Sequence, residues 1–110
     1  MECVTSVFEA HDFEETIKGV THVRPDVLIL DIRMPGGSGI DVLKTMEADI
    51  RPQLVIVFTN YADTPYFDRC MKLGADYFFD KSADIEKVVE LIRTWSVFPE
   101  KAAYHQNMNQ

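Results

Sequence analysis

The chain has 110 residues, of which 46% are hydrophobic and 26% are charged, and its formal net charge at pH 7 is −7. This length predicts a single domain with a real hydrophobic core, and this composition excludes a disordered chain. The acidic balance argues against nucleic acid as a direct partner, because binding to phosphate groups needs a basic surface.

The cysteines, histidines and apolar runs bear on the compartment and on metal binding. Cys3 and Cys70 are not spaced as a disulfide or a metal site, so we expect reduced thiols. His11, His22 and His105 do not have ligand spacing either, and surface or capping roles are expected for them. No apolar run has the length of a membrane span, and the start of the sequence does not resemble a signal peptide. We therefore expect a cytoplasmic protein that makes no membrane contact.

The first half of the chain predicts two strands and a helix. A short strand is expected over residues 4–9, and an amphipathic helix over residues 13–22 follows it, with Asp12 as its N-cap. A second strand is expected over residues 26–31, because its four consecutive apolar residues are too few for a helix and suit a strand buried on both faces. This strand ends on Asp31 and gives way to a loop rich in proline and glycine.

The second half of the chain repeats this alternation. A helix is predicted from about 39 to 48, and the continuous β-branched run at 54–58 is the strongest strand signal in the sequence. A helix at 65–73 and a short strand at 76–79 follow, and the last helix is expected over residues 84–95. The apolar positions that recur at helical spacing in this last helix are Ile85, Val88, Val89, Ile92 and Trp95.

Strands and helices thus alternate along the whole chain. The order β-α-β-α-β-α-β-α with short connections predicts the α/β class, with right-handed crossovers and a parallel, doubly wound sheet of four strands. The apolar pattern is lost after residue 95, so we expect residues 1–95 to form the domain and residues 96–110 to be a flexible C-terminal tail.

Three of the four predicted strands are followed by a side chain that can take part in chemistry. Asp31, Thr59 and Lys81 should lie close together, because the carboxyl ends of parallel strands share one edge of the sheet. A carboxylate can hold a phosphoryl group as an acyl phosphate, while an ammonium, a hydroxyl and Mg²⁺ can bind its oxygens. Each residue alone has a plainer role, as a loop cap, a turn residue and an edge lysine that prevents strand pairing. Together they favour phosphoryl chemistry.

These residues also carry a resemblance to a known family. The segment 31–39 resembles the corresponding loop in the receiver domains of two-component response regulators, and its Met34-Pro35 pair and final glycine match that loop. Thr59 follows the aspartate by 28 residues, and Lys81 comes another 22 residues on. Residues 74–76, Gly-Ala-Asp, match as well. The resemblance covers residues 1 to about 95, nearly the whole chain, and implies the flavodoxin-like fold of CheY-like receivers.

The resemblance implies a single-domain response regulator that acts in a phosphorelay. Asp31 would accept a phosphoryl group from the phosphohistidine of a sensor histidine kinase or a phosphotransfer protein, and the chain would otherwise have no enzymatic activity. Thr59 and Lys81 would contact the phosphoryl oxygens, and Phe78 would be the aromatic switch residue whose rotamer follows Thr59. Mg²⁺ would be held by Asp31 and by the backbone carbonyl of Arg33.

The chain departs from the family at its start. Receivers begin with a βα unit whose strand ends in paired acids that bind Mg²⁺, and residues 4–9 match the family's second strand, so the sequence resembles a receiver truncated at the N-terminus. We expect weakened Mg²⁺ binding and three possible outcomes. The strand at 4–9 could move beside the strand at 26–31, two copies could form a homodimer with or without strand exchange, or the chain could be a fragment of a longer receiver. In the first outcome, Glu9 or Asp12 would be candidates to replace the missing acids.

Smaller departures bear on the chemistry. Ser82 follows Lys81 where the family has a proline in a cis bond, and a cis bond before serine would cost about 3 kcal/mol. Asn60 stands where the family prefers a small residue. Arg33 and Tyr61 are bulky at positions that flank the phosphoryl group, so we expect slow hydrolysis.

Two other functions compete with the active receiver. A degenerate receiver would keep the fold and work as an interaction or dimerisation module without efficient phosphorylation; the missing acids favour it, whereas the intact Asp31, Thr59 and Lys81 favour an active receiver. A phosphatase of the haloacid dehalogenase type would need a second aspartate two residues after the first, and Arg33 occupies that position. The phosphatase is therefore set aside.

Overall fold

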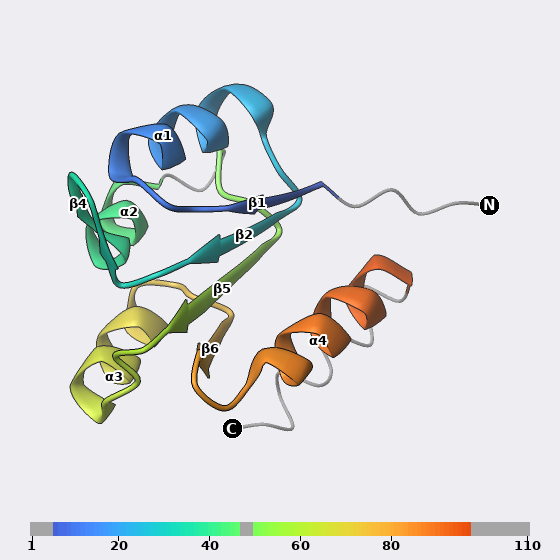
Figure 1. Cartoon of the computed structure of the whole chain (residues 1–110). Coiled ribbons are helices and arrows are strands. Elements are labelled where there is room, and N and C mark those ends of the chain that lie inside the picture. The colour runs from blue at the N-terminus through green and yellow to red at the C-terminus, as the bar shows by residue number, and fades with distance from the viewer. Residues whose placement is uncertain (1–5, 47–49, 98–110) are drawn as a thin grey trace.

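Four parallel strands form the sheet at the centre of the molecule (Figure 1). The computed structural model describes residues 6–46 and 50–97, so residues 98–110 of the predicted tail lie outside it. The strands are β1 (Val7–Glu9), β2 (Val27–Leu30), β5 (Leu54–Thr59) and β6 (Tyr77–Asp80), in the order β1-β2-β5-β6 across the sheet. All three strand pairs are parallel, and the predicted four-stranded parallel α/β sheet is confirmed.

Helices cover both faces of this sheet. The helical elements are α1 (Phe13–Lys18), the π-helical turn η1 (Gly19–Val23), α2 (Gly39–Thr45), α3 (Thr64–Lys72) and α4 (Ile85–Val97). Residues from α1, η1, α2 and α3 share one core cluster, while α4 packs on the opposite face of the sheet. None of the helices in the described part of the chain is long and apolar enough to cross a membrane.

The core is divided by the sheet because successive side chains of a strand point to opposite faces. In β2, Leu28 and Leu30 belong to the larger cluster under α1, α2 and α3, whereas Val27 belongs to the cluster under α4. All six residues of β5 are buried, as its continuous apolar run predicted. Cys70 is a free, buried thiol in the larger cluster, and burial raises its pKa to about 11. The reduced state of this thiol stays a prediction, and Cys3 lies outside the described residues.

The first strand lies directly beside the strand that precedes Asp31. β1 pairs with β2 in parallel, with Val7 opposite Val27 and Glu9 opposite Ile29. Of the three outcomes that the sequence left open, the first therefore describes this structure: the strand moves in beside β2. The dimer stays a prediction.

The loop after β2 contains a small hairpin that the sequence pattern did not predict. β3 (Arg33–Met34) pairs in antiparallel fashion with β4 (Gly37–Ser38). The turn between them has proline followed by Gly36 at φ +84°, the arrangement of a type II turn, in which glycine avoids the strain of a positive φ. Strands of two residues carry no periodicity of their own, so only this turn chemistry could have indicated them.

Helix boundaries follow the capping residues. The carboxylate of Asp12 accepts a hydrogen bond from the backbone N–H of Glu15, at 3.1 Å, which confirms Asp12 as the N-cap of α1. Ser38 caps α2 in the same way through the N–H of Asp41, at 3.1 Å. The predicted helix over 13–22 is in fact α1 followed by η1, which ends at Arg24 in the left-handed conformation.

The last helix is only partly covered. Val88 and Leu91 are buried against β5 and β6, but Ile85 is 53% exposed and Val89 46% exposed. The predicted apolar stripe is therefore wider than the contact that α4 makes. The physical reason is that α4 is the only helix, among the described residues, that packs on this face, so no neighbouring helix covers its flank.

Candidate functional site

The three residues that the strand ends predicted meet at one edge of the sheet. The hydroxyl of Thr59 donates to Oδ1 of Asp31 at 2.7 Å, and Nζ of Lys81 donates to Oδ2 of Asp31 at 2.7 Å. Both oxygens of one carboxylate are thus bonded to side chains from two other strand ends. This is the constellation that the parallel-sheet argument predicted.

Local structure explains how each of these side chains is positioned. Asp31 follows β2 directly, and Thr59 is the last residue of β5 and is fully buried. The backbone N–H of Lys81 donates to the carbonyl of Thr59 at 2.9 Å, which fixes the lysine at the end of β6 beside the threonine. The carboxylate of Asp80 accepts from both the N–H and the hydroxyl of Ser82, and this tight turn holds the chain after Lys81. No peptide bond among the described residues is cis, so the Lys81–Ser82 bond is trans.

Asp31 is held in its ionised form. Burial of the carboxyl favours its neutral state, but the hydrogen bonds from Lys81 and Thr59 and the charge of Lys81 outweigh burial. Together they hold the pKa of Asp31 below its ordinary value. The backbone N–H of Arg33 adds to this stabilisation of the anion. At neutral pH the site therefore presents a carboxylate, the form that can act as a nucleophile.

The loop that follows the site is packed tightly against Asp31. The N–H of Gly39 donates to the carbonyl of Ile32 at 2.8 Å. A Cβ on Gly39 would overlap the backbone carbonyl of Asp31, so this position requires glycine. Close packing against the backbone of Asp31 thus explains why a glycine stands at position 39, which is one of the positions that carried the family resemblance.

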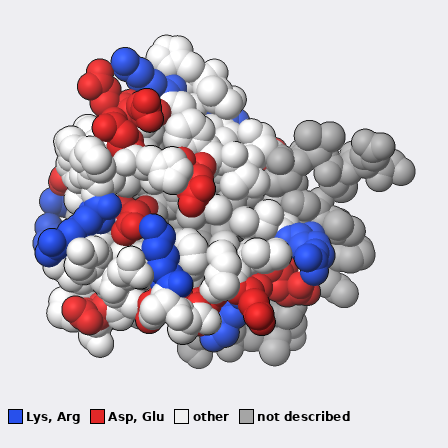
Figure 2. Space-filling model, in the orientation of Figure 1, with Lys and Arg blue, Asp and Glu red and all other residues white. Residues whose placement is uncertain are grey.

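A cavity of about 90 Å³ opens beside Asp31. The charged and polar side chains that line it are Glu9, His11, Asp31, Arg33 and Lys81. Figure 2 shows that acidic and basic side chains lie next to each other on this face of the molecule, without one large patch of a single sign. The cavity is therefore a small polar hollow rather than an apolar binding pocket.

Two of these lining residues come from the end of β1. Glu9 was one of the two acids considered as replacements, and its place in the cavity separates it from Asp12, whose carboxylate caps α1. His11 was expected to have a surface or capping role; it is exposed, but it also lines the cavity. Once the pairing of β1 with β2 is known, the period of two along a strand places His11 level with Asp31.

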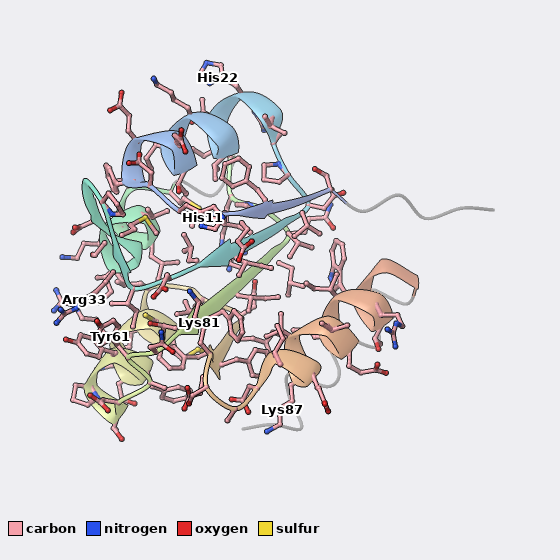
Figure 3. The ribbon with its side chains drawn as sticks, viewed as in Figure 1. His11, His22, Arg33, Tyr61, Lys81 and Lys87 are labelled. Atoms are coloured by element: carbon pink, nitrogen blue, oxygen red, sulfur yellow. The ribbon has the colours of Figure 1, made fainter. Side chains whose placement is uncertain are left out.

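Arg33 and Tyr61 stack on each other at the outer edge of the site. The guanidinium carbon of Arg33 lies 4.4 Å from the centre of the Tyr61 ring, which is a cation–π contact. Figure 3 shows these two side chains together, with Lys81 further toward the middle of the molecule and His11 near the end of β1. The backbone N–H of Tyr61 donates to Oγ1 of Thr59 at 3.1 Å, so the stack is tied to the site.

Phe78 lies in β6, three residues before Lys81, and packs under α3. Its ring is half-buried and meets the ring of Phe67 edge to face, with 5.4 Å between the ring centres. In the sheet it stands opposite Val57, two residues before Thr59. The structure thus places this side chain between the site and α3, and its switch role stays a prediction.

The described residues contain no group of three or more histidine, cysteine, aspartate or glutamate side chains placed to hold a metal ion. The oxygen donors near the cavity are the carboxylates of Asp31 and Glu9 together with main-chain carbonyls. Hard oxygen donors of this kind suit Mg²⁺, which binds through one or two carboxylates together with phosphate oxygens and water. The donor set fits such an ion, with few protein ligands.

Comparisons with known proteins agree with this geometry. Residues 1–93 match the model of the response regulator receiver domain. The chain is 31% identical over 88 residues to sporulation initiation phosphotransferase F of Bacillus subtilis (strain 168), a match that covers 80% of this chain and 71% of that protein. It is 33% identical over 92 residues to the uncharacterized transcriptional regulatory protein YvfU of the same organism, covering 84% of this chain but only 46% of YvfU.

Solved structures show the same fold. The signal receiver domain of a putative Luxo repressor protein from Vibrio parahaemolyticus superimposes with a TM-score of 0.71 at 21% identity, covering 94% of this chain and 76% of that one. A CheY-like receiver domain protein from Methanospirillum hungatei JF-1 gives a TM-score of 0.67 at 19% identity, covering 90% and 74%. The chain belongs to the family of response regulator receiver domains of two-component signal transduction.

Proposed function

We propose that Asp31 is the phosphoacceptor of this receiver, which acts in the cytoplasm, and that it takes its phosphoryl group from the phosphohistidine of a sensor histidine kinase or a phosphotransfer protein. Phosphorylation of an aspartate is the standard role of receiver domains. The observation that carries the assignment is the carboxylate of Asp31, which borders a polar cavity and is bonded at 2.7 Å to both Thr59 and Lys81.

The chemistry follows from these partners. An oxygen of Asp31 forms the new O–P bond while the P–N bond of the phosphohistidine breaks, and the imidazole nitrogen keeps the bonding electron pair. Lys81 then bonds to a phosphoryl oxygen in place of the carboxylate, and the hydroxyl of Thr59 does the same. Thr59 is buried and lies two residues after Val57, which stands opposite Phe78 in the sheet. A movement of Thr59 would therefore change the space beside the Phe78 ring, which contacts Phe67 of α3. The chain acts on no substrate other than its own aspartate.

Mg²⁺ is the cofactor that we propose, with Asp31 and the backbone carbonyl of Arg33 among its ligands. When bound, the ion would neutralise charge on the phosphoryl oxygens. The small number of acids near Asp31 supports weaker binding of this ion than a site with three carboxylates would give.

We further propose that the phosphoryl group is hydrolysed slowly. The stacked side chains of Arg33 and Tyr61 border the site, and together they would restrict the approach of water to the phosphorus atom.

Intact-mass spectrometry after incubation with phosphoramidate and Mg²⁺ tests the acceptor. We expect one phosphoryl adduct on the wild-type protein and none on Asp31→Asn, which preserves the shape of the side chain. A wild-type protein that is folded by circular dichroism and still gains no adduct would reject the proposal.

The second candidate is a degenerate receiver that works as an interaction or dimerisation module. The observation in its favour is that no group of three metal-binding side chains lies near Asp31 among the described residues. Failure of the phosphoramidate experiment would favour this function. A homodimer, for which β1 offers an edge strand, would then appear in light scattering as twice the mass of one chain.

A further inference from the structure

We propose that Glu9 supplies the second carboxylate of the Mg²⁺ site, so that the ion binds between the ends of β1 and β2. The inference rests on the proposed function, because it concerns the ion that would act with Asp31. It assigns the missing acidic ligand to a residue of the strand that has moved in beside β2.

The pairing of β1 with β2 brings the two acids to one place. Glu9 stands opposite Ile29, and Asp31 lies two residues further along the same face of the neighbouring strand. With strands about 4.8 Å apart and a rise of about 3.3 Å per residue, the two Cα atoms are about 8 Å apart. Carboxylates at this separation can converge on one ion, and the longer side chain of a glutamate provides the additional reach. Both side chains line the same cavity.

Glu9 is free to turn toward an ion. Its side chain is 57% exposed, and its ion pair with His11 has an N–O distance of 3.6 Å, which is longer than a hydrogen bond. Asp12, the other acid of this segment, is committed to the N–H of Glu15 and does not line the cavity. The structure therefore distinguishes between two acids that the sequence left as equal candidates.

The charges around the cavity also favour a cation at Glu9. The ammonium of Lys81 is directed at Asp31, at 2.7 Å, and the guanidinium of Arg33 stacks on Tyr61. A phosphoryl group on Asp31 would add further negative charge beside Glu9, and a divalent ion between them would balance both.

Direct measurement of Mg²⁺ binding tests this assignment without relying on phosphorylation. Isothermal titration calorimetry of the unphosphorylated full chain should show Glu9→Gln binding Mg²⁺ about tenfold more weakly than wild type, because one of few charged ligands is lost. Asp12→Asn is the matched control: it removes the same charge nearby but keeps the helix cap, and its Mg²⁺ affinity should stay within about twofold of wild type.

A third variant separates ligation from a general electrostatic effect. Glu9→Asp keeps the charge but shortens the side chain by one methylene, so it should also lose affinity if Glu9 is a ligand. Thermal unfolding of all three variants should match wild type, since Glu9 is mostly exposed and asparagine is an equally good cap.

Two results would overturn the inference: a Glu9→Gln variant that binds Mg²⁺ as tightly as wild type, or a folded wild-type protein that binds no Mg²⁺. Because the acceptor is tested by mass spectrometry, the two proposals can fail separately. Adducts on Asp31 together with unchanged Mg²⁺ affinity in Glu9→Gln would reject only the role of Glu9 as a ligand. Weakened Mg²⁺ binding in Glu9→Gln, together with no adduct on the wild-type protein, would reject only the role of Asp31 as phosphoacceptor.

Discussion

Asp31 and Asp76 are both carboxylates bonded to a cation, and they lie at opposite edges of the same sheet. Asp31 follows β2 at the carboxyl edge, and its partners are the side chains of Lys81 and Thr59. Asp76 precedes β6 at the amino edge, where its carboxylate accepts from the backbone N–H of Val55 at 2.8 Å and from the guanidinium of Arg51 at 3.0 Å.

The difference lies in what each carboxylate holds together. Arg51 also donates to the carbonyls of Gly74 and Pro52, so Asp76 ties two connections to the backbone of β5. Asp31 is bonded to side chains that can rotate away from it, and it borders a cavity. The carboxylate of Asp76, with its partners Arg51 and Val55, thus forms a fixed structural contact, which we call the brace. The carboxylate of Asp31, in contrast, has partners that can be exchanged for a ligand.

Removing the brace should have the largest effect on stability. Asp76→Ala leaves a guanidinium and a backbone N–H without their carboxylate, and we expect a loss of about 2–3 kcal/mol in the free energy of unfolding. Urea denaturation measures this loss. The fraction that remains folded should still gain the phosphoryl adduct, and an adduct that disappears from folded Asp76→Ala would contradict the comparison.

Removing a partner of Asp31 should have a large effect on phosphorylation and a small effect on stability. Lys81→Met is expected to slow adduct formation by about 100-fold, because the ammonium that would stabilise the phosphoryl oxygens is gone. The free energy of unfolding should change by less than about 1 kcal/mol, because the carboxylate of Asp31 keeps its hydrogen bonds from Thr59 and from the N–H of Arg33 and borders an open cavity. Time-resolved intact-mass spectrometry and urea denaturation of the same samples give both values. A large loss of stability with an unchanged rate of adduct formation would show that Lys81 stabilises the fold and does not assist phosphorylation.

The pH dependence of stability sharpens the contrast further. Because the folded-state pKa of Asp31 is lowered, its bonds contribute stability that is fully present above the unfolded value, about 3.9, and is lost as the pH falls through the folded pKa. The wild-type protein should therefore exceed Asp31→Asn in stability at pH 6, and this difference should shrink below about pH 4. Urea denaturation between pH 6 and pH 3 checks this. A stability difference between wild type and Asp31→Asn that is constant over the range would mean that the charge of the carboxylate does not contribute to stability.

The smallest expected effect concerns the stack beside the site. Tyr61→Ala removes the ring on which Arg33 lies and opens the approach of water, so hydrolysis of the adduct should be a few-fold faster. A dephosphorylation time course measures it, with Tyr61→Phe as the control that keeps the ring. Equal rates in the alanine variant and wild type would reject the shielding role.

The sequence predicted those features that depend on short-range pattern. The apolar runs around Val27 and Val55 predicted strands, and the parallel-sheet rule then brought Asp31, Thr59 and Lys81 to one edge, as the hydrogen bonds confirm. The cap at Asp12 followed in the same way from its local spacing.

Features that depend on distant partners could not be predicted with the same certainty. The pairing of β1 with β2 was one of three open outcomes, because the choice depends on which strand edge is available rather than on β1 itself. The presence of His11 in the cavity follows from that pairing. The Arg33–Tyr61 stack joins two loops, and the exposure of Ile85 reflects what does not pack against α4; neither leaves a periodic signal in the sequence.

The strand order β1-β2-β5-β6 has a consequence for how this chain acquires its structure. Each strand of the central sheet pairs with its nearest predecessor in that sheet, and paired residues such as Val7 and Val27 or Ile56 and Tyr77 are close in sequence. Parallel partners need a crossover between them, so separations of this size are short for a parallel sheet and keep the loop-closure entropy low. Each strand after β1 therefore pairs with a strand that was synthesised before it, and no strand of the central sheet has to wait for a distant C-terminal segment before it can pair.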